Sequence, residues 1–400
     1  MSRNSTYSSR FATRGRYGKK PQYGGRSRKG GSKQFIHPSK FVKPASKVEK
    51  VAYEPKNSFA DFAVHDLIKQ NIAERGFTAP LPIQDQAIPL GLEGKDVIGV
   101  ANTGTGKTVA FAVPILNKLM NDSTSRALII APTRELAQQI EAECKVFAKN
   151  SGLHGALLIG GSSMGTQLRD LRLKPRIVIG TPGRIKDHVE RGTLKLSSFN
   201  MVVLDEVDRM VDMGFINDMR FLLGRLAPSY QSFFFSATVD EKVKNLVASF
   251  SHDPTTISVV EGSTSDHVEQ DVVRYNYSGE KLDKLHDLLI ADHVEKILVF
   301  DETQRSVEKL SKELQARGFK ADAIHGGKTQ GARQRALSRF KGNNINVLVA
   351  TDVAARGIDV VDITHVINYS TPNTYDDYVH RIGRAGRAGR KGYALTFVSS

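Results

Sequence analysis

The regular alternation of short apolar runs with longer helical segments most strongly limits how this chain can fold. After residue 51 the runs KDVIGVA, RALIIAP, RIVIGTP, NMVVLDE and QSFFFSAT are each followed by a segment with the apolar spacing of an α-helix. The runs lack the apolar/polar alternation of half-exposed strands, so both faces of each strand should be buried. This pattern predicts a doubly wound α/β domain with a parallel sheet covered by helices on both faces.

A second α/β domain is predicted in the C-terminal part of the chain. The pattern weakens in SHDPTTISVVEGSTSDHVEQ and resumes with KILVFDE, KADAIHG, NVLVATD, THVINYS and YALTFVS. A length of 400 residues also suits two domains plus extensions. We therefore expect a first domain over 89–260, preceded by a short region at 57–88, and then a linker at 261–267. The second domain should cover 268–400.

Most of the excess positive charge lies in residues 1–50, which hold 14 Lys and Arg and a single acid, Glu49. This segment is rich in Gly and Ser and has no apolar periodicity, so we expect it to be disordered. Aromatic residues are interleaved with its basic residues: Tyr7, Phe11, Tyr17, Tyr23 and Phe35. The basic residues could contact phosphates and the aromatic residues could stack on bases, which favours an RNA-binding tail. A tail that only increases solubility is the alternative.

Cysteine usage and hydropathy limit the classes of protein. Cys144 is the single cysteine, which excludes an internal disulfide and a Cys-rich zinc site and suits a reducing compartment. No apolar run approaches the roughly 18 residues of a transmembrane helix. We expect a cytoplasmic protein without a membrane partner.

A phosphate-binding loop is predicted where the first strand ends, at Ala101-Asn102-Thr103-Gly104-Thr105-Gly106-Lys107-Thr108. Its glycines let backbone N–H groups surround phosphates, Lys107 can reach the β- and γ-phosphates, and Thr108 can ligate Mg²⁺. The usual pattern begins with Gly where this chain has Ala101. A structural glycine-rich turn is the alternative.

Three acids follow the strand NMVVL, in the order Asp205, Glu206, Val207, Asp208. A solvent-exposed acidic loop is one explanation for these three charges. Together with Lys107, however, they predict a nucleoside triphosphatase in which Asp205 holds Mg²⁺ through water and Glu206 orients or deprotonates the attacking water.

From about Phe59 to its end, the chain resembles the DEAD-box ATP-dependent RNA helicases. FTAPLPIQ resembles the Q motif, and the sequence AxTGxGKT, DEVD, SAT and HRIGRAGR follow in family order. The resemblance implies two tandem RecA-like domains and implies ATP and Mg²⁺ as cofactors. It places Gln84 and Phe77 on the adenine, Phe59 at the upstream aromatic position, and Asp359 at the ribose.

The resemblance also assigns residues to catalysis, coupling and RNA. Arg384 and Arg387 would reach the γ-phosphate across the interdomain cleft, although in isolation they could form an ordinary basic helix face. Asp208 would couple the ATP site to Ser236 and Thr238. The implied RNA contacts are Pro132, Thr133, Arg134, Gly160, Gly161, Thr181, Gly183, Arg184, Arg333 and Thr351.

These residues predict an enzyme that is active only when its two domains close around the nucleotide. The second domain has no Gly-Lys-Thr of its own, so one nucleotide must serve both domains, and hydrolysis requires that they meet. We expect a monomeric, RNA-stimulated ATPase that contacts the RNA backbone without sequence specificity and separates short duplexes or remodels RNA–protein complexes. An ATP-gated RNA clamp or annealing chaperone is the alternative.

Two positions depart from the family pattern: Val207 replaces the Ala of motif II, and Ala385 replaces the Thr common in motif VI. Neither change removes a carboxylate or an arginine. Val207 adds volume at a position that we expect to be buried, which demands repacking around it.

Overall fold

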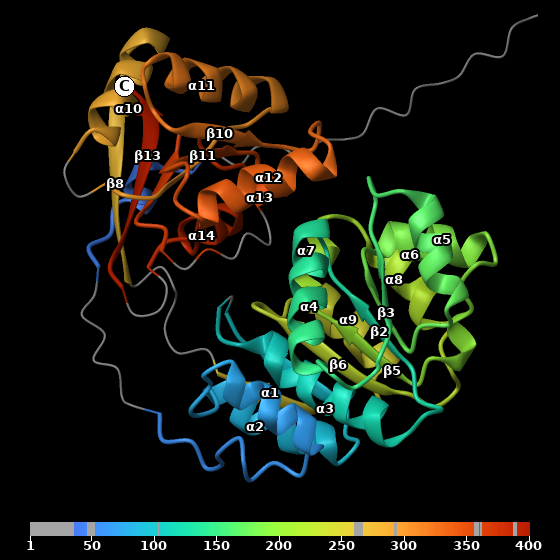
Figure 1. Ribbon diagram of the computed structural model, residues 1–400. Helices are drawn as coiled ribbons and strands as arrows, with labels where there is room; N and C mark the ends of the chain where they lie inside the picture. Colours follow the sequence, from blue (N-terminus) through green and yellow to red (C-terminus); the bar gives the residue numbers. More distant parts are fainter. Residues whose placement is uncertain are drawn as a thin grey trace, which may run out of the picture.

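Two parallel β-sheets, each at the centre of its own domain, form the protein (Figure 1). The computed structural model describes residues 36–45, 53–102, 104–259, 267–291, 294–355, 360, 362–386 and 390–400. The first sheet has the order β3-β4-β2-β5-β6-β1-β7. Its strands are β1 (Val97–Val100), β2 (Ala127–Ile130), β3 (Gly155–Leu158), β4 (Ile177–Gly180), β5 (Met201–Leu204), β6 (Gln231–Ser236) and β7 (Thr255–Ser258).

Helices cover both faces of the first sheet. They are α1 (Asp66–Glu74), α2 (Pro82–Leu92), α3 (Lys107–Asn121), α4 (Arg134–Phe147), α5 (Met164–Arg172), α6 (Pro182–Glu190), α7 (Val207–Asp212), α8 (Ile216–Leu223) and α9 (Glu241–Phe250), with a short 3₁₀ helix at Leu196–Ser198. Along β2, Ala127 and Ile129 pack with α1 to α4, whereas Leu128 and Ile130 pack with α6 to α9. This two-sided burial explains why the strand sequence shows no polar alternation.

The second sheet has the order β10-β11-β9-β12-β13-β8. Its strands are β8 (Val268–Tyr275), β9 (Ile297–Phe300), β10 (Ala321–Ile324), β11 (Val347–Ala350), β12 (His365–Asn368) and β13 (Gly392–Ser399). Its helices are α10 (Ser278–Leu289), α11 (Gln304–Ala316), α12 (Gln330–Lys341), α13 (Asp352–Ala355) and α14 (Tyr375–Ile382). The paired strands in both sheets run parallel, which confirms the predicted fold class.

Part of the basic N-terminal segment is folded, which corrects the expectation that all of residues 1–50 are disordered. A 3₁₀ helix at Pro38–Phe41 packs on the second domain, and Phe41 is fully buried there. The reason is local: Phe41 is one large apolar side chain whose burial offsets the ordering of a few neighbours. The expectation for residues 1–35 and 46–50 lies outside the described residues.

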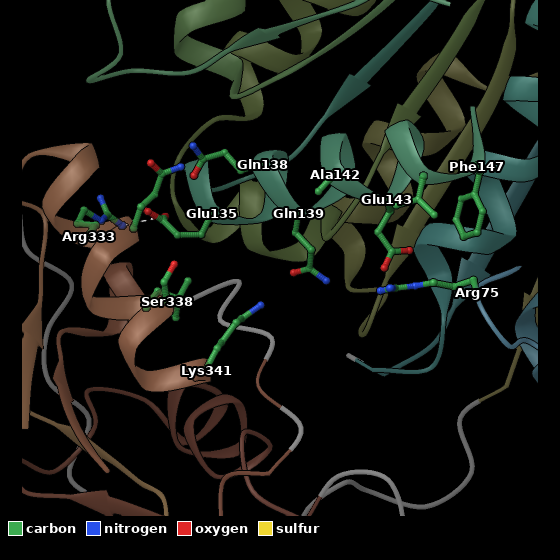
Figure 2. Close-up of a pocket in the computed structure, with 13 residues that line it drawn as sticks. Arg75, Glu135, Gln138, Gln139, Ala142, Glu143, Phe147, Arg333, Ser338 and Lys341 are labelled. Atoms are coloured by element: carbon green, nitrogen blue, oxygen red, sulfur yellow. Dashed lines mark ion pairs between the residues drawn. The ribbon is translucent and has the colours of Figure 1, made fainter. Parts of the chain in front are cut away.

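The two domains contact each other along α4 and α12, which face one another across a cleft (Figure 2). Arg333 of α12 forms an ion pair with Glu135 of α4 at 2.8 Å, and both side chains are buried. Gln330 donates a hydrogen bond to Gln138 at 3.0 Å. Beside these contacts the cleft has a volume of about 590 Å³.

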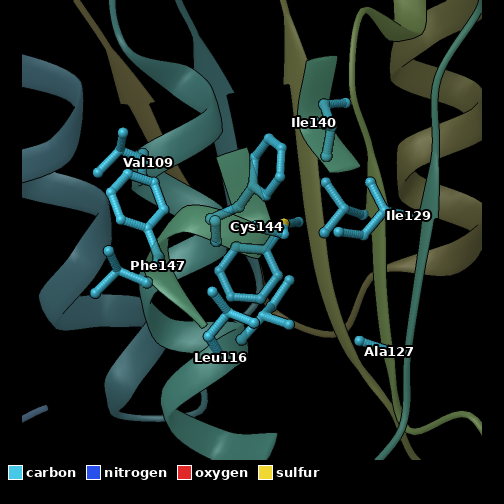
Figure 3. Packing of buried hydrophobic residues seen from close by; sticks show 14 of the residues in the cluster. Val109, Leu116, Ala127, Ile129, Ile140, Cys144 and Phe147 are labelled. Carbon is cyan, nitrogen blue, oxygen red and sulfur yellow. The ribbon is translucent and has the colours of Figure 1, made fainter. Parts of the chain in front are cut away.

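Cys144 of α4 is a core residue of the first domain (Figure 3). It lies among apolar side chains that include Ile129, Ile140 and Phe147. Burial raises the pKa of its thiol to about 12, so the group stays protonated and unreactive at neutral pH. Within the described residues, no helix has both the length and the apolar character needed to cross a membrane.

A close approach between β3 and β4 makes Gly180 a sensitive position. A Cβ atom there would lie 2.2 Å from the backbone oxygen of Leu158, which also accepts a hydrogen bond from Thr181. We therefore expect Gly180→Ala to lower the free energy of unfolding of the first domain by about 1–3 kcal/mol, measured by urea denaturation with hydrogen exchange of that domain's amides. Gly183→Ala is the control, because no heavy atom beyond its chain neighbours and the backbone of its own helix lies within 4 Å of its Cβ position; equal effects of the two changes would contradict the steric explanation.

Candidate nucleotide and RNA site

The carboxyl ends of β1, β6 and β5 lie side by side at one edge of the first sheet, and the predicted catalytic segments follow them. The strands β1 and β5 are separated by β6, with Val100 opposite Ser236 and Phe234 opposite Leu204. The parallel fold therefore places Lys107, at the start of α3, and Asp205, directly after β5, on either side of Ser236. Ligands of open α/β sheets bind at this kind of edge.

The loop after β1 has the backbone that the glycines predict. Gly104 and Gly106 both have φ of +84°, a conformation that side chains rarely allow. At Gly106 a Cβ atom would also lie 2.2 Å from Nε2 of Gln84. The Lys107 ammonium donates a hydrogen bond to the carbonyl of Ala101 at 2.8 Å, so it lies folded over the loop.

A cavity of about 450 Å³ opens at this loop and is lined by eight of the residues predicted to bind the nucleotide or to act in its hydrolysis. It is lined by Gly104, Gly106, Lys107, Thr108, Phe77, Gln84, Asp205 and Glu206, together with further residues of the Q-motif segment and α4. Gln84 donates to the carbonyl of Gly106 at 3.1 Å and accepts from the N–H of Leu81 at 2.9 Å. Gln84 thus ties the Q-motif helix α2 to the phosphate-binding loop.

The aromatic residues form two layers beside the cavity. Phe77 lines the cavity and is exposed over 36% of its surface. The ring of Phe59 stacks on that of Phe77 with centroids 6.2 Å apart, and Phe59 is buried in the core. Phe59 is not among the residues that line the cavity; its ring lies behind Phe77 and supports it.

Asp205 and Glu206 carry the strongest signs of a functional site. Burial raises the pKa of Asp205 to about 7, opposed by the nearby Lys107 ammonium. Glu206 has a left-handed backbone with φ of 55°, which is strained for a residue with a side chain. Its Oε2 atom is buried and makes no hydrogen bond within the described structure. A buried carboxylate oxygen at a cavity can accept a hydrogen bond from a water or ligand that binds there.

The oxygen atoms at the cavity fit a magnesium ion bound together with phosphates. Thr108 offers a hydroxyl and Asp205 a carboxylate, and both residues line the cavity. Among the described residues, no group of three or more His, Cys, Asp and Glu side chains has the arrangement of a metal site. Such a small donor set suits Mg²⁺, which typically binds one or two protein oxygens and completes its shell with substrate phosphates and water.

Asp208 connects the catalytic segment to the end of β6. Its Oδ2 accepts hydrogen bonds from the N–H of Ala237, from the N–H of Thr238 at 2.9 Å, and from the Thr238 hydroxyl at 3.0 Å. The N–H of Asp208 donates to the hydroxyl of Ser236 at 3.2 Å. The structure thus brings together the three residues predicted to couple the ATP site to RNA.

The predicted RNA residues of the first domain follow β2, β3 and β4, on the same edge of the sheet. Arg134 lies directly against Gly160 and Gly161: a Cβ atom on Gly161 would be 2.3 Å from Nη1 of Arg134. A side chain at Gly161 would therefore displace this guanidinium. Thr133 caps α4 through its hydroxyl, which accepts from the N–H of Leu136.

At the end of β4, Thr181 and Arg184 offer further donors. The Thr181 hydroxyl makes no capping hydrogen bond to α6. Arg184 has a buried Nη1 atom without a hydrogen-bond partner in the described structure. Unpaired donors at a helix start are suited to a phosphate.

Glu135, Gln138 and Gln330 form a contact that the sequence alone did not predict. The Arg333 guanidinium, predicted to bind RNA, is paired here with Glu135 across the domain boundary. Thr351, directly after β11, is buried. Glu135 directly follows the Pro-Thr-Arg segment, so the sequence marks it as part of a functional motif. No pattern within a single sequence indicates that it contacts α12.

Arg384 lies at the domain boundary but not at the nucleotide cavity. With Arg209 of α7, it lines a small separate pocket between the domains that also involves Arg381 and Asp352. Arg381 forms a two-point ion pair with Asp352, which fixes α14 to α13. The structure therefore does not bring Arg384 to Lys107. Thr103, Asp359 and Arg387 lie outside the described residues.

Comparison with known proteins identifies the family of this chain. Residues 81–246 match the family model "DEAD/DEAH box helicase", and residues 280–389 match "Helicase conserved C-terminal domain". The ATP-dependent RNA helicase CshA of Listeria monocytogenes is 45% identical over 342 residues, which are 85% of this chain and 66% of that relative. This chain thus spans just under two thirds of that relative's length.

Two solved structures resemble the fold closely. S. cerevisiae Dbp5 bound to RNA and ADP BeF3 is 28% identical, with a TM-score of 0.74 over 86% of this chain and 90% of that one. Mss116p bound to ssRNA and AMP-PNP is 29% identical, with a TM-score of 0.78 over 87% of this chain and 76% of that one. The two family models together match more than half of the 400 residues. The chain belongs to the DEAD-box helicase family.

Proposed function

We propose that the protein is an RNA-stimulated ATPase that separates short RNA duplexes locally. The observation that carries the proposal is the single cavity shared by Lys107, Asp205 and Glu206, in which a buried Glu206 oxygen has no partner among the described residues. Hydrolysis of the γ-phosphate needs a cation for the phosphates, a metal ligand and a group that orients water. These three residues provide all of them within one space.

Each of the cavity residues would have a distinct role in ATP binding and hydrolysis. The Lys107 ammonium would leave the Ala101 carbonyl to contact the β- and γ-phosphates, and Thr108 and Asp205 would hold Mg²⁺. The ion would supply charge neutralisation on the phosphate oxygens. The Glu206 carboxylate would accept a proton of the attacking water, which bonds to the γ-phosphorus as the bond to the β-phosphate oxygen breaks. Phe77 would stack on the adenine.

Coupling to RNA would pass through the end of β6. Because Asp208 accepts three hydrogen bonds from Ala237 and Thr238, a shift of the catalytic turn must move that segment as well. On the same edge, Arg134 and Arg184 would bind RNA phosphates. Such contacts read the backbone and not the sequence of bases.

Closure of the two domains would complete the site. Arg384 lies at the boundary, so a further rotation of the second domain would carry it toward the γ-phosphate, and Arg387 and Asp359 would act with it. An arginine that arrives only on closure contributes roughly 10³ to 10⁵ in rate, which makes hydrolysis depend on RNA-induced closure. We further propose that the protein acts as a monomer in the cytoplasm.

An ATP-gated RNA clamp is a second candidate. The buried Glu135–Arg333 ion pair joins the two domains directly, which suits a protein whose output is a long-lived closed state. A strand-displacement assay separates the two candidates: release of a short strand with ATP supports the helicase, and slow RNA release without strand separation supports the clamp.

Replacing Glu206 by Gln should lower kcat for RNA-stimulated ATP hydrolysis by at least about 100-fold while ATP binding changes little. The amide keeps the shape of the side chain but cannot accept a proton from water. Turnover is measured by phosphate release and binding by a fluorescent ATP analogue. Glu241→Gln on exposed surface is the matched control; similar turnover in both variants would refute the role given to Glu206.

Deleting residues 1–35 should weaken RNA binding and flatten its salt dependence. This segment holds ten Lys and Arg and no acid. Each phosphate that the segment binds should add about 0.7 to the slope of log K against log salt, so the shortened chain should have the smaller slope. The measurement is RNA affinity by fluorescence anisotropy at several salt concentrations. Identical slopes with and without the segment would show that it acts as a solubilising tail only.

A further inference from the structure

Residues 36–45 dock on the second domain, although they precede the first domain in the sequence. Lys43 and Gln270 of β8 exchange two backbone hydrogen bonds, at 3.0 and 2.9 Å, in antiparallel orientation. The strand β8 is last in the order of its sheet, so this pair lies at the edge of the sheet. In Figure 1 the blue segment lies against the second domain. Addition of an extended segment to a sheet edge is a recurring mode of peptide recognition.

Phe41 is the apolar anchor of this segment. Its side chain is fully buried, and the centroid of its ring lies 4.7 Å from that of Tyr378. Both residues belong to a core cluster that also contains Ile382 and Val268, the first residue of β8. The next residue in the chain, Val42, is 51% exposed. A change at position 41 therefore reaches the core of the second domain, whereas a change at position 42 reaches solvent.

Tyr378 belongs to α14, and this helix has two faces with different neighbours. Residues 378, 382 and 385 follow the i, i+4, i+7 spacing of one helix face, and all three lie in the cluster with Phe41. Residues 377, 380, 381 and 384 lie on another face and line the small pocket between the domains. The N–H of Arg384 donates to the carbonyl of Arg381 at 3.1 Å, so the helical turn continues to this residue. Phe41 thus packs on the core side of the helix, and Arg384 lies on its cleft side.

A hydrogen bond joins the docked edge to the same helix. The Tyr378 hydroxyl donates to the side-chain oxygen of Gln270 at 2.9 Å, and both residues are buried. Gln270 therefore contacts Lys43 through its backbone and α14 through its side chain. On the cleft side, Arg381 forms a two-point ion pair with Asp352, at 2.5 and 2.7 Å. The orientation of α14 is thus fixed from both sides.

The turn that follows Arg384 packs against the start of β8. Gly386 has φ of +68°, and a Cβ atom there would lie 2.9 Å from a side-chain carbon of Val268. Val268 lies in the cluster with Phe41. A movement of Val268 into the space left by a smaller side chain at position 41 would therefore also affect the turn next to Arg384.

We propose that Phe41 is a positioning residue for ATP hydrolysis, which acts through α14 by holding this helix so that Arg384 is correctly oriented for the γ-phosphate. Truncation of Phe41 leaves a cavity on the core side of α14, and the surrounding side chains fill such a space only in part. Because protein interiors are close-packed, a shift of the helix also displaces the residues on its cleft side. A displacement of about 1 Å in a catalytic group can lower the rate roughly 100-fold. This inference rests on the proposed function, which assigns Arg384 to the γ-phosphate.

The test compares four variants of the full chain by steady-state ATP hydrolysis at saturating RNA, well below the unfolding temperature of each. Phe41→Ala removes the anchor, and Tyr378→Phe keeps the ring but removes the hydrogen bond to Gln270. Leu314→Ala in α11 is the control for stability, because it truncates a fully buried side chain in the cluster on the other face of the same sheet. Val42→Ala is the control for the exposed neighbour.

We expect Phe41→Ala to lower kcat by about 10- to 100-fold and Tyr378→Phe to lower it by about three- to tenfold, with KM for ATP and RNA affinity nearly unchanged. Leu314→Ala should lower the unfolding temperature of the second domain about as much as Phe41→Ala, yet leave kcat within about twofold. Val42→Ala should change neither quantity. Equal losses of kcat in Leu314→Ala and Phe41→Ala would reduce Phe41 to a contribution to stability. Unchanged kcat in Phe41→Ala overturns the inference, and if that variant does not fold, unchanged kcat in Tyr378→Phe does so.

Hydrogen exchange of the α14 amides separates this inference from the proposed function, because it requires neither ATP nor RNA. Phe41→Ala should raise the exchange rates of these amides by at least about tenfold, and Leu314→Ala should not. If the unsubstituted chain hydrolyses no ATP, the proposed function fails and the role in hydrolysis fails with it, while faster exchange confined to α14 would still support the docking of Phe41 on this helix. If the unsubstituted chain hydrolyses ATP and Phe41→Ala changes neither exchange nor kcat, the proposed function stands and the positioning role is refuted.

Discussion

The left-handed turn at Glu206, between the buried strand β5 and helix α7, is the constraint on which the site depends. Within four residues the chain places three carboxylates in different surroundings: Asp205 and Glu206 line the cavity, where one Glu206 oxygen has no partner among the described residues, and Asp208 accepts from the segment after β6. A regular helix or strand would not direct neighbouring side chains in three such directions. The strain at φ of 55° is therefore the local cost of separating three like charges, and the buried strand that precedes the turn holds it in place.

Val207 contributes to holding this turn. It is fully buried in the cluster that also contains Leu204 and Met210, so its additional volume relative to Ala is absorbed by the core of the first domain and not by the cavity. Ala385 is likewise buried in the second core, next to the close approach of Gly392. Val207 and Ala385 thus affect the packing of the two domain cores, and neither residue lines the nucleotide cavity.

The sequence predicted the parallel sheets because strands buried on both faces leave a clear pattern, as β2 and β5 show. The family resemblance also predicted the partners of Asp208, Ser236 and Thr238, which the structure brings together. The sequence did not predict the folding of residues 36–45, because one aromatic residue among basic and small residues has no period to detect. Nor could it separate the layers formed by Phe59 and Phe77, or pair Glu135 with Arg333, because these depend on packing between distant segments.

The docking of Phe41 also decides where the basic segment begins. Residues 1–35 join the folded chain at Ile36, which packs on the second domain, although the sequence continues into the first. Ten positive charges therefore start from the β8 edge and not from the nucleotide domain. Because electrostatic attraction is screened over about 8–10 Å at physiological salt, these charges can act only on phosphates that the segment itself approaches. Under the proposed function, RNA bound by the segment would lie near the second domain, and the attraction would act on closure as well as on affinity.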